Sequence, residues 1–355
     1  MPRIPDFPTS FPGHDESHPL RLMEICGTHT MSIARAGLRE LLPAQVQLIS
    51  GPGCPVCVTP AGAIDAVLKL SLTPGVVIAT FGDLMRVPGS VRGETLAACR
   101  AKGAAVRMVY SAADALTLAR ENPERQVVFL GVGFETTAPG TAACILAASR
   151  EKLHNFSVLS LGKYTEPALR ALLNDPDCVI DGLICPGHVA TVLGAEAFRF
   201  LPQEYHRPAV VAGFETGDLL RAVGDLCRMA AAGQADLIND YPRAVRADGN
   251  PAARAAMEQV FEPKDDYWRG LGLIANSGMA IRPEFSEFDA AKKFGFVPGE
   301  GTETPGCRCG EVLRGAIRPE FCPLFGKICT PADPVGPCMV SGEGACAAAY
   351  KYRRV

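Results

Sequence analysis

Short runs of apolar, largely β-branched residues alternate with longer stretches of helical character along most of the chain. The first runs that predict strands lie at 46–49, 76–79, 104–109 and 127–131. The Ala-, Leu- and Arg-rich stretches between them are typical of helices that cross over between parallel strands. Because the runs are almost continuously apolar, we expect both faces of the sheet to be covered. The pattern predicts an α/β fold.

A second set of apolar runs follows the first and resembles it. These runs lie at 157–161, 179–184, 209–212 and 236–238. Two short motifs recur between the sets in the same order, the second of them being Gly-Asp-Leu at 82–84 and 217–219. Recurrence at nearly constant spacing indicates two duplicated α/β lobes with parallel sheets. Chance similarity between Gly- and Pro-rich strand ends is the alternative, because such turns are common.

The first repeated motif aligns residues that carry reactive or metal-binding atoms. Gly-Cys-Pro-Val-Cys-Val places Cys54 and Cys57 where Ile-Cys-Pro-Gly-His-Val places Cys185 and His188. Open α/β sheets bind ligands at the carboxyl ends of their strands, so these loops would meet in one cleft if the lobes face each other. A C-x-x-C sequence at that position indicates a redox dithiol. Half of a zinc-binding pair is the alternative.

Another loop, Cys-Gly-Thr-His, places Cys26 and His29 three residues apart. Three residues bring two side chains together on a helical turn. The pair could be a nucleophile with its base, or two ligands for a transition metal. The alternative is a purely structural role, in which the segment is a capped helix start and its cysteine is buried.

The alternation of strands and helices stops after about residue 263, and the rest of the chain is rich in Gly, Pro and Cys. Such a segment is expected to be organised by a metal rather than by a hydrophobic core. Six of the chain's 14 cysteines lie within it: Cys307, Cys309, Cys322, Cys329, Cys338 and Cys346.

Composition bears on the compartment and on the class of partner. The chain has 355 residues, a number that favours two or three domains, and a net charge of −3, which lacks the basic field of a nucleic-acid binder. No apolar stretch is long enough to span a bilayer, and the N-terminus lacks the pattern of a signal peptide. We therefore expect a cytoplasmic protein without a membrane or nucleic-acid partner.

That compartment changes the interpretation of the six clustered cysteines. Disulfides conflict with a reducing cytosol, and zinc sites usually show paired C-x-x-C sequences, which this segment lacks. An iron–sulfur cluster needs four thiolates, tolerates wide spacing and often has a proline beside a ligand, as at Cys322-Pro323. We favour the cluster over zinc or plain thiols. Two sulfurs would remain beside it, which suggests a redox-active pair.

Together these segments resemble the HypD family, iron–sulfur maturation proteins of [NiFe]-hydrogenase. The resemblance covers nearly the whole chain after residue 20. The matching segments are C-G-T-H-T at 26–30, G-P-G-C-P-V-C at 51–57, G-F-E-T-T-A-P from 133, C-P-G-H-V from 185, and the tail at 321–346.

The resemblance assigns the clustered cysteines. The family's C-x14-C-x6-C-x16-C motif falls on residues that would hold a [4Fe-4S] cluster: Cys307, Cys322, Cys329 and Cys346. Cys309 and Cys338 would then form a redox disulfide near it. The family also implies α/β lobes at 41–150 and 151–265, with an irregular, partly helical iron–sulfur domain from residues 1–40 and 266–355.

The resemblance further implies a function and a working site. The protein would be a scaffold and redox assistant, rather than a turnover enzyme, for assembling the Fe(CN)2CO group. Cys26 would bind the iron together with a HypC partner, and HypE/HypF proteins would deliver cyanide. The site would consist of Cys26, His29, Cys54, Cys57 and His188. A cluster-dependent reductase of protein disulfides is the rival function.

Overall fold

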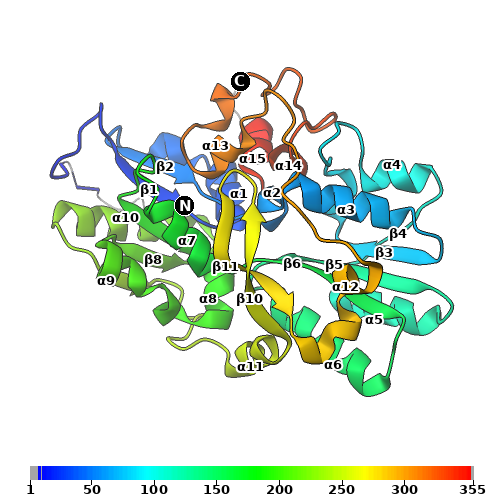
Figure 1. The fold of residues 1–355 in the computed structure, drawn as a ribbon. Helices are drawn as coiled ribbons and strands as arrows, with labels where there is room; N and C mark the ends of the chain where they lie inside the picture. Colours follow the sequence, from blue (N-terminus) through cyan, green and yellow to red (C-terminus); the bar gives the residue numbers. More distant parts are fainter. Residues whose placement is uncertain (1–6, 9, 353–355) are drawn as a thin grey trace.

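Two parallel sheets with helices on both faces form most of the computed structural model, which describes residues 7–8 and 10–352 (Figure 1). The first sheet has four strands in the order β4-β3-β5-β6. Their bounds are β3 Val76–Thr80, β4 Ala105–Met108, β5 Gln126–Gly133 and β6 Phe156–Gly162. The predicted α/β class with parallel sheets is confirmed.

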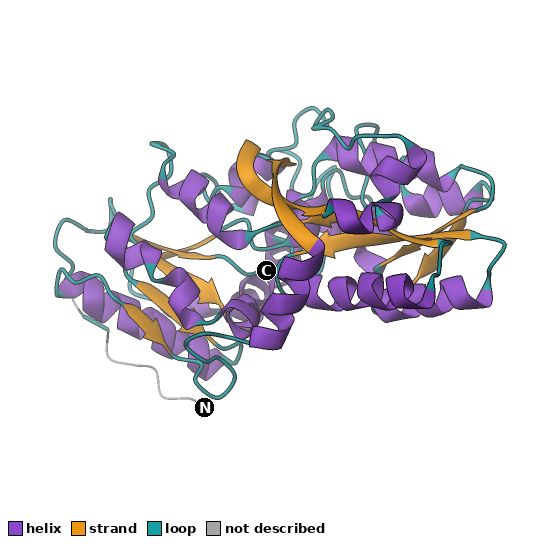
Figure 2. Ribbon diagram, turned by 60° about the horizontal axis from the view of Figure 1, so that its bottom comes forward, coloured by secondary structure: helices purple, strands orange, loops and turns teal. Residues whose placement is uncertain are grey.

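The second sheet has five strands in the order β2-β1-β7-β8-β9, all parallel. Their bounds are β1 Leu20–Glu24, β2 Val46–Ser50, β7 Gly182–Pro186, β8 Ala209–Ala212 and β9 Leu237–Asn239. The chain thus enters this sheet, leaves it to build the first one, and returns at β7. The two sheets lie side by side in Figure 2, with helices on either side.

All eight predicted apolar runs overlap strands, but their grouping along the chain is wrong at two of them. β2 joins the second sheet and β6 joins the first. The sequence missed β1, whose Arg21 and Glu24 interrupt the apolar run even though Glu24 is fully buried. Because β1 lies between β2 and β7, it determines that β2 belongs to the second sheet. Strand pairing does not test the predicted domain boundaries, because these describe folding units. The boundaries stay a prediction.

Local sequence explains the helices that cover the sheets. α5 (Ala112–Glu121) begins at a capping box in which Ser111 and Asp114 satisfy each other's backbone N–H groups. α1 (Gly27–Ala36) ends at Gly37, which adopts the left-handed conformation that glycine accepts most readily. The remaining long helices are α3 Ala61–Ser71, α6 Ala138–Glu151, α7 Thr165–Leu173, α10 Thr216–Ala231 and α11 Pro251–Val260.

An antiparallel hairpin, β10 (Phe261–Trp268) and β11 (Gly272–Ile281), lies where the sequence predicted irregular chain. Its first strand has three consecutive charged residues at 264–266 and a proline at its third position, a weak strand signal. The hairpin lies against β6: the Ser160 hydroxyl donates to the Met279 carbonyl at 2.6 Å. It therefore extends from the first sheet toward the C-terminal segment.

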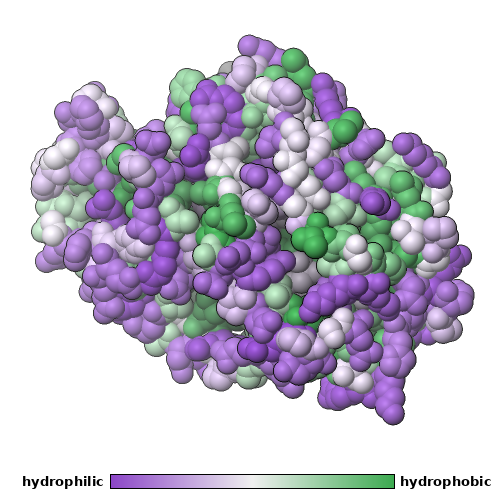
Figure 3. Space-filling model, in the orientation of Figure 1, coloured by the Kyte–Doolittle hydropathy of each residue, from purple (hydrophilic) through white to green (hydrophobic). Residues whose placement is uncertain are grey.

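The C-terminal segment is mostly irregular, with the short helices α13 (Cys309–Leu313), α14 (Pro337–Val340) and α15 (Ala345–Tyr352). α15 packs on α1 and α14 packs on α2 (Pro55–Val58), so the C-terminal segment covers these two early helices above the sheets (Figure 1). No helix in the described part of the chain could cross a bilayer. Hydrophilic residues cover most of the face in Figure 3, and the hydrophobic residues form small groups.

The hairpin is held to the first sheet by a buried ion pair. Lys163 Nζ, 2% exposed, lies 2.7 Å from Asp266 Oδ2 and donates to the Tyr267 carbonyl at 2.8 Å. Desolvation lowers the pKa of Lys163 to about 8, although Asp266 opposes this shift. The lysine thus depends on its partner for its charge.

Replacing Lys163 with Met should lower the free energy of unfolding by roughly 3–5 kcal/mol, because Asp266 keeps a buried charge without its main partner. Lys264 lies 3.6 Å from the same carboxylate but is 35% exposed, so Lys264→Met should cost less than about 1 kcal/mol. Urea unfolding of both variants measures the difference. Equal losses would show that burial of Lys163 does not determine the strength of the pair.

Candidate functional site

Three adjacent strand ends bring together the motifs that the sequence singled out. Glu24, the last residue of β1, pairs with Ser50 of β2 and with Ile184 of β7. The loops that follow carry Cys26, the C-x-x-C sequence and His188. Parallel strands end at the same edge of a sheet, so these loops are neighbours although they are distant in sequence.

The loops of Cys26 and of the C-x-x-C sequence are in backbone contact. The Gly27 N–H donates to the Gly53 carbonyl at 3.0 Å. A Cβ atom on Gly53 would lie 2.2 Å from the backbone nitrogen of Cys26, so only glycine permits this approach. The glycine in the G-C-P-V-C sequence therefore has a steric role.

A cavity of about 340 Å³ lies between the strand ends of the two sheets. Cys26 and His188 line it from the second sheet, and Phe81 and the loop 132–137 line it from the first. We call this cavity the cleft. Residues from both predicted lobes therefore line one cavity.

Cys26 is buried, lines the cleft and is the residue before the first turn of α1. Desolvation raises the pKa of its thiol to about 12, partly offset by the backbone N–H groups of His29 and Thr28. The thiol is therefore neutral at pH 7 in the metal-free chain. A cation bound there would displace its proton.

Cys54 and Cys57 are joined by a disulfide that lies behind the wall of the cleft. Pro55 and Val56 line the cleft, whereas the two cysteines are 4% and 0% exposed. Cys54 caps α2, because its sulfur accepts the Cys57 N–H at 3.2 Å. Cys57 Sγ also lies 4.0 Å from the Pro337 carbonyl oxygen at the start of α14.

The two predicted site histidines have different environments. His188 is exposed and lines the cleft, whereas His29 is fully buried and does not. The Phe214 ring lies between them, with centroids 4.7 Å from His29 and 3.9 Å from His188. Desolvation lowers the pKa of His29 to about 4, so this ring is neutral at pH 7. His29 therefore supports the site from behind.

Sequence reasoning missed two carboxylates that line the cleft. Asp83 accepts a hydrogen bond from the Ser341 hydroxyl at 2.7 Å, and Glu343 accepts one from the Thr28 hydroxyl at 2.6 Å. Residues 341–343 thus connect the ends of both sheets. Asp83 appeared in the sequence only as part of a repeat, and nothing in the local pattern identified Glu343.

All six clustered cysteines line one narrow, largely apolar cavity behind the cleft: Cys307, Cys309, Cys322, Cys329, Cys338 and Cys346. The Cys309 and Cys338 sulfurs are 2.8 Å apart. Cys329 Sγ accepts the Val335 N–H at 3.4 Å, the type of backbone contact that tunes cluster sulfurs. The structure therefore gathers the predicted ligands and the leftover pair in one place.

This donor set includes the four thiolates that an iron–sulfur cluster needs. Among the described residues, no three Cys, His, Asp or Glu side chains are placed to share one ion. A cluster does not need that arrangement, because each thiolate binds a separate iron atom.

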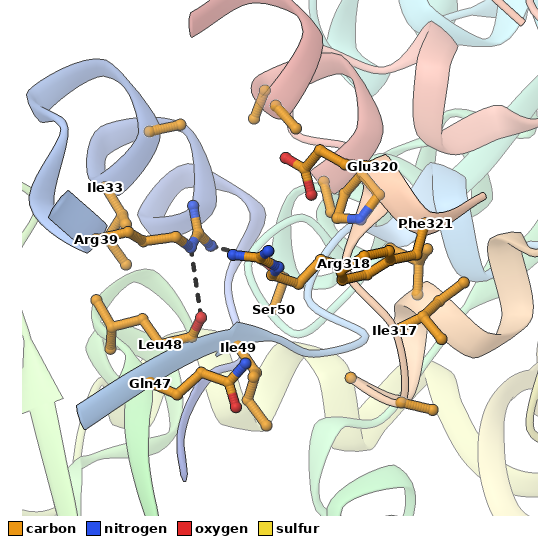
Figure 4. A pocket seen from close by; sticks show the side chains of 18 of the residues that line it. Ile33, Arg39, Gln47, Leu48, Ile49, Ser50, Ile317, Arg318, Glu320 and Phe321 are labelled. Atoms are coloured by element: carbon orange, nitrogen blue, oxygen red, sulfur yellow. Dashed lines mark hydrogen bonds between the residues drawn. The ribbon is translucent and has the colours of Figure 1, made fainter. Parts of the chain in front are cut away.

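A larger cavity, about 540 Å³, lies elsewhere (Figure 4). It runs along β2, the edge strand of the second sheet, where Arg39 donates to the Leu48 carbonyl and to the Ser50 hydroxyl. None of the described residues that line it is a cysteine or histidine. Its size therefore does not make it the candidate site.

Comparisons with known proteins identify relatives of this chain. A profile of the HypD family, described as "Hydrogenase formation hypA family", matches residues 12–353. The chain is 48% identical over 346 residues to hydrogenase maturation factor HypD of Azotobacter vinelandii, covering 96% of this chain and 91% of that protein. It is 48% identical over 337 residues to hydrogenase maturation factor HypD of Escherichia coli, covering 95% and 90% respectively. The chain belongs to the HypD family.

Proposed function

We propose that this chain is a hydrogenase maturation factor that serves as scaffold and redox assistant in building the Fe(CN)2CO group of [NiFe]-hydrogenase. One observation supports this most directly. A cleft thiol, Cys26, lies in front of a buried disulfide, and that disulfide adjoins α14, which carries Cys338 of the six-cysteine cavity. The sulfurs thus form a series from the cavity to the cleft.

Cys26 is the proposed iron ligand, shared with a small HypC-type partner. A thiolate suits iron with cyanide and carbonyl ligands, because sulfur is a soft, electron-donating atom. Binding would release the thiol proton, and the high pKa of Cys26 holds that proton until metal arrives. His188 faces the same cleft and is available as a ligand or proton donor.

Cys54 and Cys57 are the proposed source of electrons for cyanide release. A carrier thiocyanate of the HypE/HypF type loses cyanide when its S–C bond takes up two electrons and one proton. A dithiol gives two electrons and two protons as its S–S bond forms, so the balance leaves one proton free. The disulfide between Cys54 and Cys57 is the oxidised product of that step.

A [4Fe-4S] cluster held by Cys307, Cys322, Cys329 and Cys346 would supply single electrons. Cys309 and Cys338, 2.8 Å apart, would collect them in pairs. α14 carries Cys338 and touches Cys57, so it connects the two thiol pairs. We place these reactions in the cytoplasm, without nucleic acid or membrane.

The rival, a reductase of protein disulfides, fits the exposure of the sulfurs less well. Such an enzyme must bring its attacking sulfur into contact with a substrate disulfide. Cys54 and Cys57 are 4% and 0% exposed, behind Pro55 and Val56. The cleft admits a small group or a narrow peptide end more readily than a folded protein.

Replacing Cys26 with Ala should abolish the cyanide and carbonyl infrared bands of chain co-purified with its HypC-type partner, because the iron loses its ligand. Iron and acid-labile sulfide should stay near four each per chain, since the cluster thiols are untouched. Cys99→Ala, a buried cysteine on α4 (Leu96–Ala101), is the matched control. Retained cyanide bands in the Cys26 variant would refute the ligand role, and zinc in place of iron would refute the cluster.

Glu343→Gln should reduce the cyanide band intensity roughly 10–100-fold, the range for residues that orient metal ligands. The amide oxygen can still accept the Thr28 hydroxyl, so the variant removes the charge while it keeps the contact. Glu320→Gln, exposed in the same C-terminal segment, is the control. Wild-type bands in Glu343→Gln together with loss in Glu343→Ala would assign Glu343 a purely structural role.

A further inference from the structure

The cavity of about 540 Å³ lies between the edge of the second sheet and the C-terminal segment (Figure 4). One wall is the edge strand β2, with residues 47–50, and other walls come from residues 312–321 and from α15. Its volume falls within the range of small-molecule sites in proteins, about 300–1,000 Å³. The proposed iron and cyanide chemistry uses none of the residues that line it. We call it the edge cavity.

Two of the arginines that line the edge cavity have no ion-pair partner among residues 7–8 and 10–352. Arg21 Nη2 donates to the Gly315 carbonyl at 2.7 Å, whereas Arg21 Nε is buried without a hydrogen-bond partner. The exposed Arg318 guanidinium lies over the Phe321 ring, 5.2 Å from its centroid. Neither contact neutralises a charge, so both side chains bring an uncompensated cation to the cavity.

A third arginine, Arg39, has only a distant carboxylate partner. Its Nη2 lies 3.6 Å from Glu24 Oε1, and its Nε donates to the Leu48 carbonyl at 3.4 Å. Figure 4 shows Arg39 and Arg318 entering the cavity from opposite sides, with their guanidinium groups turned toward each other. Like charges repel each other, and the low-dielectric walls of a cavity strengthen that effect. An anion between the two groups would therefore be stabilised.

Two carboxylates also line the edge cavity, but they do not neutralise these cations. Glu40 and Glu320 are exposed, and neither forms an ion pair with the three arginines in the part of the chain that the structure describes. Solvent and salt screen exposed charges more strongly than partly buried ones. The cavity therefore keeps a positive field.

Small apolar side chains form a wall beside these charges. Ala345, Ala348 and Ala349 share one face of α15, because residues three and four apart are neighbours on a helix. Ile33 and Ala34 of α1 extend this wall. Apolar walls with a few placed polar groups are typical of small-molecule sites. The lining thus suits a ligand with an apolar body and an anionic group.

The outer edge of β2 is poorly suited to accept a further strand at this place. Strand addition needs free backbone groups along an edge strand. The Leu48 carbonyl already accepts Arg39 Nε, and Arg39 Nη2 donates to the Ser50 hydroxyl at 3.1 Å. The space therefore favours a small molecule over an extended segment of a partner protein.

We propose that the edge cavity binds a small organic oxyanion, a phosphate ester or a carboxylate with an apolar body. Arg39 and Arg318 hold the oxyanion through charge-assisted hydrogen bonds, and Arg21 adds positive charge. The apolar body packs on the alanine face of α15. A bound ligand connects the edge of the second sheet to residues 312–321, which lead directly to Cys322.

The test is a ligand-observed NMR titration of the full-length chain with phenyl phosphate, benzoate, inorganic phosphate and benzyl alcohol. Arg318→Gln removes an exposed guanidinium, and Ala349→Leu fills the apolar wall while it keeps the three cations. Arg35→Gln is the matched control, because Arg35 is an exposed arginine of α1 that does not line the cavity. Hydrogen exchange with and without phenyl phosphate locates the bound probe.

Phenyl phosphate should bind at least about fivefold more tightly than inorganic phosphate, because it adds apolar contact, and benzyl alcohol should not bind saturably. Arg318→Gln should weaken phenyl phosphate at least about tenfold, since a charge-assisted hydrogen bond is lost. Ala349→Leu should weaken phenyl phosphate by a similar factor and leave inorganic phosphate within about twofold, because it removes only space. The control should not change.

Hydrogen exchange should slow in both walls of the cavity, at residues 46–50, 312–321 and 345–352. Tighter binding of phenyl phosphate than of benzoate would support the proposal and identify a phosphate ester. The opposite order would support it and identify a carboxylate.

Absence of saturable binding by both phenyl phosphate and benzoate would overturn the inference. Equal affinities in Arg318→Gln and the unsubstituted chain, or slowed exchange only in other parts of the chain, would do the same. Benzyl alcohol that binds as tightly as phenyl phosphate would show that the arginines do not select an anion, and this too would refute the proposal. If Ala349→Leu does not fold, Arg318→Gln decides, because the Arg318 side chain is exposed.

Discussion

The structure depends on one geometric constraint, the side-by-side placement of the carboxyl ends of β2, β1 and β7. Because all three strands are parallel, their loops leave the sheet at one edge. The contact between Gly53 and the backbone of Cys26 then brings two of these loops together. The cleft and the disulfide behind it both follow from this edge.

The sequence predicted the α/β class and the position of each apolar strand, because buried parallel strands consist of continuous hydrophobic runs. It could not predict strand order, since β1 carries Arg21 and Glu24 in a buried strand and was not recognised. The C-x-x-C and C-P-G-H sequences could be recognised from the sequence, because cysteine and histidine in such turns more often have a functional than a purely structural role. Asp83 and Glu343 could not, because carboxylates are common on surfaces and these two acquire meaning only through tertiary contacts.

The C-terminal segment carries the clustered cysteines and also contacts the cleft. Ser341 and Glu343 reach the ends of opposite sheets, and α14 touches Cys57 from behind. The same short stretch therefore borders the cleft, the dithiol and the six-cysteine cavity.

The burial of Cys54 and Cys57 also affects the rate at which this pair exchanges with thiols outside the protein. Thiol–disulfide exchange requires a sulfur to approach in line with the S–S bond, and both cysteines are almost completely buried, with Pro55 and Val56 lining the cleft beside them. Cellular glutathione would therefore equilibrate with this pair slowly. The oxidation state of the pair would then depend on its last reaction within the protein rather than on the redox potential of the surroundings. Each chain would stay oxidised after it has donated its electrons, until it is reduced again from within.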